Sequence, residues 1–404
     1  MGTPSYGFHP HDVPEGSTGI DREVLDLMNR YKVVGLSIHL IKEGKSFWSN
    51  SYGWADLDRK IPVRKTTFFR VASISKTVVA TALMQQYEEG KFRLDDDIGD
   101  ALGFPVRNPH HPREKITYRH LMTHTTGLRS DEETGEVYVR YSMACQCSHP
   151  PSLKEVFLPG GAFYTHDLWS PSKPGESFAY SNLGTIILAT LLERWSGKRM
   201  DLYCKDHIFA PLGMTRSGFH LRDFQNMDDL AVLYEYDPAQ NRFSVGTDDL
   251  KGRRPEPLDL RDYVPGTTGA VFSPQGGLRT TAGDLAQFLL AHMKDGEHEG
   301  VRILSPDTAR LMHQPHFINP RSGELFREIG LQFHITEEFV PGKRMIGHSG
   351  EAYGLLSSMY FHKEERFGII FIMNGSAYRK GRRSGFFDVE EALAELLYQR
   401  QICG

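Results

Sequence analysis

Four short apolar segments near the C-terminus, separated only by short turns, place the tightest limit on the fold of this chain. The turns between them include Pro341-Gly342 and the charged run 363–366. Short turns join antiparallel strands, whereas parallel strands need long crossovers. The sequence therefore predicts consecutive antiparallel strands at IGLQFHI (329–335), RMIGHSG (344–350), GLLSSMYFH (354–362) and FGIIFIMN (367–374).

Two similar segments near the N-terminus, 33–41 and 46–54, predict a β-hairpin. Helices are predicted by apolar periodicity at 75–90, 182–197, 281–293 and 389–399, and the first two stop at a glycine. Together these elements predict an α+β fold in which helices flank an antiparallel sheet. We expect an α/β sheet domain built from 1–90 plus 269–404, and an inserted helical, loop-rich domain at 91–268.

The charge balance narrows the class of partner. The 404 residues include 47 basic and 51 acidic residues, a net charge of −4, with no prominent basic run. We therefore expect a small-molecule or peptide substrate and no nucleic-acid partner. No apolar run is long enough for a membrane span, and the first residues lack the apolar stretch of a signal peptide. We expect a cytoplasmic protein unless a signal has been removed; the oligomeric state stays open.

Residues that could hold a metal or form disulfides follow no recognised spacing. The cysteines form no C-x-x-C pair and are expected to be free thiols: Cys145, Cys147, Cys204 and Cys403. Several histidines lie beside prolines without the i, i+4 spacing of a zinc motif: His9, His11, His110 and His111. We expect neither a metal nor a cofactor.

The stretch Gly347-His348-Ser349-Gly350 is one residue short of G-x-S-x-G, the turn that exposes a nucleophilic serine in α/β-hydrolases. The second glycine of that motif is replaced by Glu351. A nucleophile elbow joins a strand to a helix in a mostly parallel sheet, whereas Ser349 is followed by more strand. Ser349 is therefore not expected to be a nucleophile.

A stronger candidate is the pair Ser73 and Lys76, three residues apart at a helix start, where both side chains point the same way. Lys76 falls on the apolar stripe of the helix, and burial disfavours the charged ammonium. A nearly neutral amine beside a serine can act as a general base. In the alternative interpretation, Ser73 caps the helix and Lys76 extends to water. A second S-x-x-K match, Ser170 to Lys173, has no helix to align it.

Tyr180 and Asn182 form a Y-x-N triplet directly before a long apolar helix. A phenol and an amide at a helix entry can point into a cleft. The alternative is a packed tyrosine with Asn182 as the helix N-cap. The third element is His348-Ser349-Gly350 on a strand.

In this order the three motifs resemble those of the serine β-lactamase and penicillin-binding-protein superfamily, in its class C-like branch. That branch includes DD-peptidases, D-aminopeptidases and β-lactamase-fold esterases. Further similar segments span about 34–375 and include LMTHTTGL (121–128) and GGLRTTAGDLAQF (276–288). The resemblance implies a β-lactamase/transpeptidase-like fold and a serine hydrolase that works through an acyl-enzyme on small amides or esters, such as D-amino-acid peptides.

The resemblance also implies a role for each matched position. Ser73 would be the acylated nucleophile, and Lys76 and Tyr180 would share the acid–base work. Asn182 would bind the substrate amide or Lys76. The strand His348-Ser349-Gly350 would line the cleft, and the backbone N–H groups of Ser73 and Glu351 would form the oxyanion hole.

Two departures from the family pattern bear on the substrate. β-Lactamases of this branch carry a lysine where this chain has His348, and a small residue is common where it has Glu351. Both changes predict weak recognition of a substrate carboxylate and inefficient β-lactam hydrolysis. An acyltransferase of the same fold and a catalytically silent penicillin-binding-like protein remain alternatives, although the intact Ser73, Lys76 and Tyr180 disfavour the silent protein.

Overall fold

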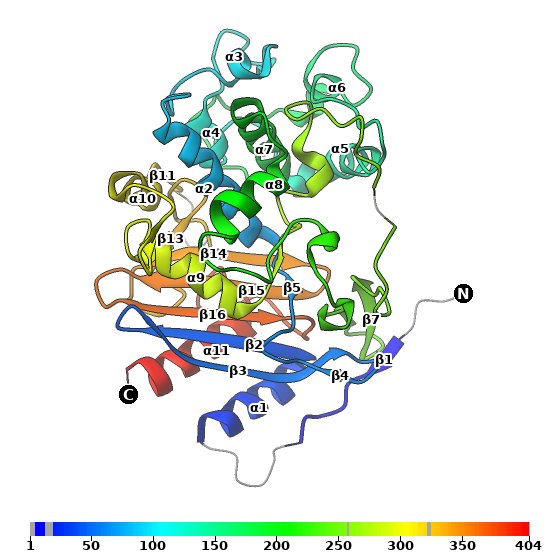
Figure 1. Cartoon of the computed structure of the whole chain (residues 1–404), viewed down its shortest axis with the longest axis vertical. Coiled ribbons are helices and arrows are strands. Elements are labelled where there is room, and N and C mark those ends of the chain that lie inside the picture. The colour runs from blue at the N-terminus through cyan, green and yellow to red at the C-terminus, as the bar shows by residue number, and fades with distance from the viewer. Residues whose placement is uncertain (1–4, 13–18, 257, 321–324, 404) are drawn as a thin grey trace.

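The computed structural model describes residues 5–12, 19–256, 258–320 and 325–403. Its central element is a nine-stranded antiparallel sheet (Figure 1). Across the sheet the strands follow the order β11 (Phe317–Ile318), β12 (Glu328–Ile329), β13 (His334–Thr336), β14 (Met345–Ala352), β15 (Leu355–His362), β16 (Phe367–Met373), β2 (Gly35–Lys42), β3 (Lys45–Asp56) and β4 (Ile61–Pro62).

The two ends of the chain meet in the middle of this sheet. Strand β16 pairs with β2, so Met373 lies opposite Leu36. The N-terminal hairpin β2–β3 and the antiparallel C-terminal strands are therefore confirmed. The single strand predicted at 329–335 is wrong in detail, because a tight turn splits it into β12 and β13. In that turn the Gly330 N–H donates to the carbonyl of Phe333 at 2.8 Å.

The sheet is covered by helices on both faces (Figure 1). Helices α1 (Gly19–Tyr31) and α11 (Asp388–Leu397) pack together on one face, and α9 (Ala282–Met293) packs on the other. The larger apolar core continues from α9 into the remaining helices: α2 (Ser75–Glu88), α3 (Ile98–Leu102), α4 (Tyr118–Met122), α5 (Asp131–Ala144), α6 (Lys154–Phe157), α7 (Asn182–Ser196), α8 (Met200–Cys204) and α10 (Pro306–His313). An α+β fold with an antiparallel sheet flanked by helices is thus confirmed.

Helix α7 illustrates how local sequence sets the boundaries. The Ser181 side chain accepts a hydrogen bond from the Gly184 N–H at the start of the helix, so Ser181 rather than Asn182 is the N-cap. The helix ends at Gly197, whose φ of 66° is the left-handed conformation that glycine adopts at low cost. None of the helices in the described ranges is long and apolar enough to cross a bilayer.

Short strands outside the main sheet were not predicted from the sequence. Strand β7 (Arg242–Thr247) pairs with both β6 (Leu233–Asp237) and β1 (Ser5–Gly7). Two small pairs complete the set: β5 (Phe69–Arg70) with β8 (Arg279–Thr280), and β9 (Glu297–His298) with β10 (Val301–Arg302). The β5–β8 pair matters for the site, because it fixes the backbone that leads to Ser73.

Candidate active site

Ser73 lies in a 3₁₀ turn, Ala72–Ile74, directly before α2. The preceding residue, Ala72, has a φ of +44°, a left-handed conformation that is uncommon for a residue with a Cβ. Such a conformation persists only where the surroundings hold it. Here the Ser75 hydroxyl donates to the Ala72 carbonyl at 2.6 Å and accepts from the N–H of Leu278 at 3.1 Å. The backbone around Ser73 is therefore fixed by its neighbours.

Lys76 follows one turn later and meets Ser73. Its Nζ lies 3.0 Å from Ser73 Oγ and 2.8 Å from the carbonyl oxygen of Gln275. The Lys76 side chain is fully buried, so the alternative in which it extends to water is wrong. The amine therefore lies within hydrogen-bonding distance of the hydroxyl whose proton a general base would take.

Tyr180 lies immediately before α7 and beside Lys76. The Lys76 Nζ is 4.8 Å from the centre of the Tyr180 ring. The ring stacks on His124 with centroids 4.5 Å apart and on Phe326 with centroids 5.0 Å apart. Asn182, the half-buried first residue of α7, follows two positions later. The phenol is therefore held between two aromatic side chains next to the Ser73–Lys76 pair.

Strand β14 forms the wall opposite α2. A Cβ added to Gly350 would lie 2.4 Å from the Val71 carbonyl and 3.1 Å from the Ser73 nitrogen, so only glycine fits this approach. Strand β13 pairs with β14 only from Met345 to Gly347. Within the described residues, the next five residues of β14 have no strand on that side, and this free edge offers backbone donors beside Ser73.

His348 lies on the same face of β14 as Gly350 and is 1% exposed. Its ring centre is 3.8 Å from that of His334 and 6.5 Å from that of Tyr180. Burial lowers the pKa of His348 to about 3, and the nearby Lys76 acts in the same direction. At neutral pH this position therefore supplies no positive charge.

The alternation of β14 turns Ser349 and Glu351 the other way. The Ser349 hydroxyl reaches Tyr360, which packs in the core on the α11 side of the sheet. The Glu351 carboxylate accepts a hydrogen bond from the Tyr378 hydroxyl at 2.9 Å. Both side chains thus lie on the face opposite Ser73, and only their backbone atoms remain near it. The Glu351 charge expected in the cleft is absent from it, and Ser349 has no place there as a nucleophile.

Two buried histidines belong to the site although the sequence assigned them no role. Burial and the nearby Lys76 lower the pKa of both His124 and His334 well below the usual range. With His348 they surround Lys76 with neutral rings. His124 lies in the segment LMTHTTGL, which carried the family resemblance without pointing to a contact, and its flanking threonines gave no further signal.

The second S-x-x-K match is not a comparable pair. Ser170 and Lys173 lie in a loop between the short turn His166–Leu168 and α7. The Ser170 hydroxyl accepts from the N–H of Ser172, and the Lys173 N–H donates to Glu176. The four cysteines predicted to be free thiols are free in the structure.

Known proteins resemble this chain in sequence and in fold. The family model described as Beta-lactamase matches residues 20–394. A penicillin-binding protein of Bacillus subtilis is 25% identical over 334 residues, which cover 82% of this chain and 66% of the relative.

Two solved structures share the fold. The D-amino acid amidase of Ochrobactrum anthropi, complexed with L-phenylalanine amide, superposes with a TM-score of 0.66 at 21% identity, covering 94% of this chain and 98% of the amidase. EstCE1, described as a hydrolase with promiscuous acyltransferase activity, gives a TM-score of 0.65 at 20% identity, covering 93% and 98%. At these identities the likeness concerns the fold alone.

Proposed function

This chain belongs to the beta-lactamase family, and we propose that it is a serine hydrolase that cleaves small amides or esters through an acyl-enzyme on Ser73. The observation that carries the proposal is the 3.0 Å distance between Lys76 Nζ and Ser73 Oγ, with Lys76 fully buried. A serine needs a group that takes its proton and donors that stabilise the developing oxyanion. The Ser73 turn, Lys76, Tyr180 and the free edge of β14 have the geometry for these tasks.

The proposed reaction has two steps, acylation of Ser73 and hydrolysis of the resulting ester. Ser73 Oγ forms a bond to the substrate carbonyl carbon, and its proton passes to the Lys76–Tyr180 pair. The bond from that carbon to the leaving nitrogen or oxygen breaks, and the leaving group takes a proton from the same pair. A water molecule then attacks the Ser73 ester and loses a proton to the pair. The bond from the acyl carbon to Ser73 Oγ breaks, the pair returns a proton to Oγ, and the acid is released.

Backbone groups would stabilise the tetrahedral intermediates. The N–H groups of Ser73 and Glu351 are the proposed oxyanion hole, and the close approach of Gly350 to the Ser73 nitrogen supports this pairing. Asn182 would bind the substrate amide or orient Lys76. Removing one such donor typically costs about 10²-fold or more in kcat.

The charge of the cleft favours a substrate that is neutral, or bears an amine, near the scissile bond. His348 is uncharged at neutral pH, so the fixed cation that would anchor a carboxylate is missing. The relatives include an amidase that acts on D-amino acid amides by its name and a penicillin-binding protein. We therefore propose D-aminoacyl amides, esters and short peptides as the substrate class.

Transfer of the acyl group to an alcohol or amine is the second candidate. EstCE1, which shares the fold, is described as having promiscuous acyltransferase activity. The same acyl-enzyme serves both reactions, and the acceptor that reaches it decides the product. Chromogenic esters, D- and L-aminoacyl anilides and a cephalosporin, each with and without added alcohol, separate hydrolysis from transfer.

Covalent labelling tests the proposal directly. A fluorophosphonate should add one adduct per chain, seen by intact-protein mass spectrometry, and Ser73→Ala should abolish it. The matched control is Ser349→Ala, which should label like the wild type because Ser349 lies on the opposite face of β14. Labelling lost in Ser349→Ala but retained in Ser73→Ala would overturn the assignment.

A further inference from the structure

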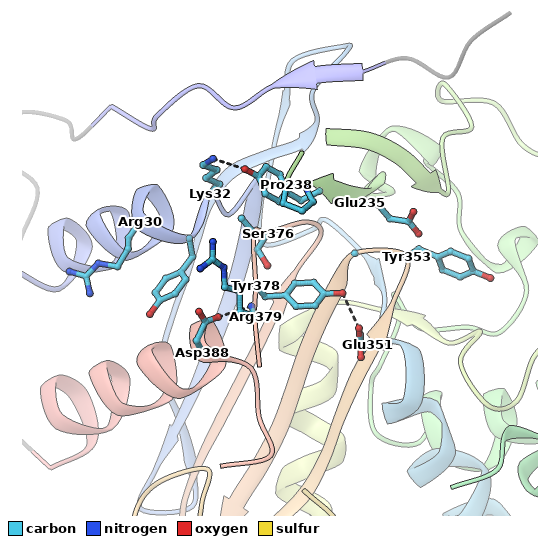
Figure 2. Close-up of a pocket in the computed structure, with 14 residues that line it drawn as sticks. Arg30, Lys32, Glu235, Pro238, Glu351, Tyr353, Ser376, Tyr378, Arg379 and Asp388 are labelled. Carbon is cyan, nitrogen blue, oxygen red and sulfur yellow. Dashed lines mark hydrogen bonds between the residues drawn. The ribbon is translucent and has the colours of Figure 1, made fainter. Parts of the chain in front are cut away.

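A cavity of about 810 Å³ lies at one end of the sheet, separate from Ser73. We call it the sheet-end cavity; it is bounded by the end of α1 (Arg30–Lys32), the β14–β15 turn (Glu351–Gly354), the segment 376–379, and residues 235–238 and 388. Figure 2 shows these residues arranged around one region, with the Arg30 and Tyr353 side chains directed outward at its two ends. Glu351 lines this cavity, whereas its neighbour Gly350 contacts the Ser73 turn, so β14 separates the two sites.

The walls of the sheet-end cavity are held by backbone contacts. The Ala377 N–H donates to the Tyr31 carbonyl at 2.8 Å, which ties the segment after β16 to the end of α1. The β14–β15 turn has left-handed residues at Tyr353 and Gly354, the geometry of a tight hairpin. A Cβ at Gly354 would lie 1.9 Å from the Tyr234 carbonyl, so this turn packs directly on β6. The cavity therefore needs no rearrangement to form.

Its charged side chains are unevenly distributed: one side carries three cations and the Asp388 carboxylate, which accepts the Arg379 N–H at 3.0 Å. Figure 2 shows Arg30, Lys32 and Arg379 toward one side together with Asp388, and Glu235 and Glu351 toward the other side. Lys32 Nζ donates to neutral partners, the hydroxyl of Tyr236 at 2.6 Å and the side-chain oxygen of Asn241. The exposed guanidinium groups of Arg30 and Arg379 form no ion pair with a described residue. Cations are thus available for an anionic group from outside the chain.

Between the two charged sides lies a polar group without a partner. The Ser376 hydroxyl is buried, with 1% of the residue exposed, and its oxygen has no hydrogen bond. A buried hydroxyl without a partner is unfavourable, so such groups are rare unless a ligand or water completes them. Beside it, burial and the Glu351 carboxylate raise the pKa of Tyr378, so its phenol stays protonated and donates to Glu351.

We propose that the sheet-end cavity is a second ligand site that binds a small zwitterion, a short peptide with free termini. Its carboxylate would meet Arg30 and Arg379, its ammonium would meet Glu235 and Glu351, and Ser376 would bond to its backbone. The volume lies within the range of about 300–1,000 Å³ typical of small-molecule sites. The mixed charges exclude a simple anion site, because a lone anion would also face the two glutamates.

The test is calorimetric titration of Ser73→Ala protein with trialanine and its capped forms. Ser73→Ala prevents turnover and leaves the cavity intact. Trialanine should bind at least about tenfold more tightly than N-acetyl-trialanine or trialanine amide, since each cap removes one charged contact. Arg379→Gln should abolish the preference over the amide, and Glu351→Gln the preference over the acetyl form.

Two further variants fix the position of the ligand. Ser376→Val removes the unpaired hydroxyl and should weaken trialanine binding without changing the relative order of the capped forms. The control is Arg382→Gln, which removes an exposed cation three residues after Arg379 that does not line the cavity. It should leave the affinity for trialanine unchanged. Absence of saturable trialanine binding, or equal binding of all capped forms, would overturn the proposal. So would affinity unchanged by both Arg379→Gln and Glu351→Gln.

Discussion

His124 contacts Tyr180 and both of its neighbours in the chain. Its imidazole stacks on the Tyr180 ring at 4.5 Å, its carbonyl accepts the N–H of Ala179 at 2.9 Å, and its Nδ1 accepts the N–H of Ser181 at 3.3 Å. His124 itself has a φ of +56°. The backbone of His124 thus holds the residue before the tyrosine and its side chain holds the residue after it, which makes His124 a positioning residue for the phenol.

Replacing the stacking ring should therefore slow the reaction. His124→Asn keeps a side-chain acceptor and tolerates the left-handed backbone, but removes the ring. We expect kcat on an ester to fall by roughly tenfold or more with little change in KM, as for a misplaced acid–base group. Thermal unfolding of the same variant is the control. A kcat equal to that of the wild type would show that the stack has no role in catalysis.

Lys76→Ala and Tyr180→Phe should each lower kcat on an ester by roughly 10²-fold or more, the scale of acid–base catalysis. Steady-state kinetics on a chromogenic ester measure this. Lys173→Ala is the matched control from the second S-x-x-K sequence, and it should stay near wild type because Lys173 lies in a loop. Comparable losses at Lys76 and Lys173 would contradict the assignment.

A neutral substrate should have a higher kcat/KM than the same substrate with a free carboxylate. For a D-alanyl dipeptide analogue with a free carboxylate and for its amide, we expect the amide to be preferred at both pH 5.5 and pH 8. The reason is that the pKa of His348 is about 3, so the cleft gains no cation across this range. A free carboxylate would lose hydration in this cleft without a cation to compensate it, whereas the amide has no charge to desolvate.

Two variants sharpen the same measurement. Glu351→Gln should leave the preference unchanged, because its carboxylate bonds Tyr378 on the opposite face of β14. His348→Lys should shift the preference toward the free acid. A free acid favoured at both pH values in the wild type, or a preference that changes on acidification through pH 6.5, would contradict the neutral state of His348.

Gly350→Ala should disturb the nucleophile. The new Cβ would lie 2.4 Å from the Val71 carbonyl, and a backbone atom cannot move without shifting the Ser73 turn. A displacement of about 1 Å can cost ~10²-fold, so we expect a comparable fall in the rate of fluorophosphonate labelling. The control is Gly283→Ala in α9, where the new Cβ makes only an ordinary 3.7 Å contact and labelling should be unchanged.

Glu390 gives the protein a measurable pH dependence of stability. Burial raises its pKa from 4.5 to about 7, and the Ser358 hydroxyl donates to it at 2.7 Å. The folded state therefore holds this proton where the unfolded state has released it. Stability should fall as the pH rises from about 4.5 to about 7, by about 3 kcal/mol at ~1.4 kcal/mol per unit.

Glu390→Gln should remove this part of the slope, because the amide does not titrate. Urea unfolding of wild type and variant at pH 5 and pH 8 measures the difference, in which the other titrating groups cancel. Glu395→Gln, a half-exposed carboxylate on the same helix, is the control and should retain the wild-type slope. Parallel pH profiles for wild type and Glu390→Gln would contradict a proton on Glu390.

Apolar periodicity and short turns were sufficient to predict the long strands of the main sheet (β2, β3, β14, β15 and β16) and the helices α2, α7, α9 and α11, whereas the short strands β4 and β11 were not predicted. The amphipathic α1 was missed, although its buried residues follow helical spacing: Val24, Leu25, Leu27 and Met28. The break between β12 and β13 depends on a tertiary contact, since the Gln332 N–H donates to the Met122 carbonyl, and no local pattern reports this.

For the site, the spacing of Ser73 and Lys76 predicted their contact, because residues three apart on a helix lie on the same side of it. It also brought Ser349 and Glu351 into the candidate set, because a motif names consecutive residues. In a strand every second side chain points to the other face of the sheet. Which residues of β14 face the cleft is set by its pairing with β15, and the motif alone does not show this. His124 and His334 come from distant segments, so only the folded chain brings them to Lys76.

Because side chains alternate along β14, the lengths of its flanking turns determine which residues face the cleft and which face the opposite side. Substitutions at His348 or Gly350 can alter the cleft, and substitutions at Glu351 the sheet-end cavity, independently of each other. A one-residue deletion carried into the strand would instead exchange the two sets, turning Glu351 toward Ser73 and Gly350 toward the cavity. Variation in this segment should therefore be accepted residue by residue but rejected as insertions or deletions, whether it arises by mutation or by design.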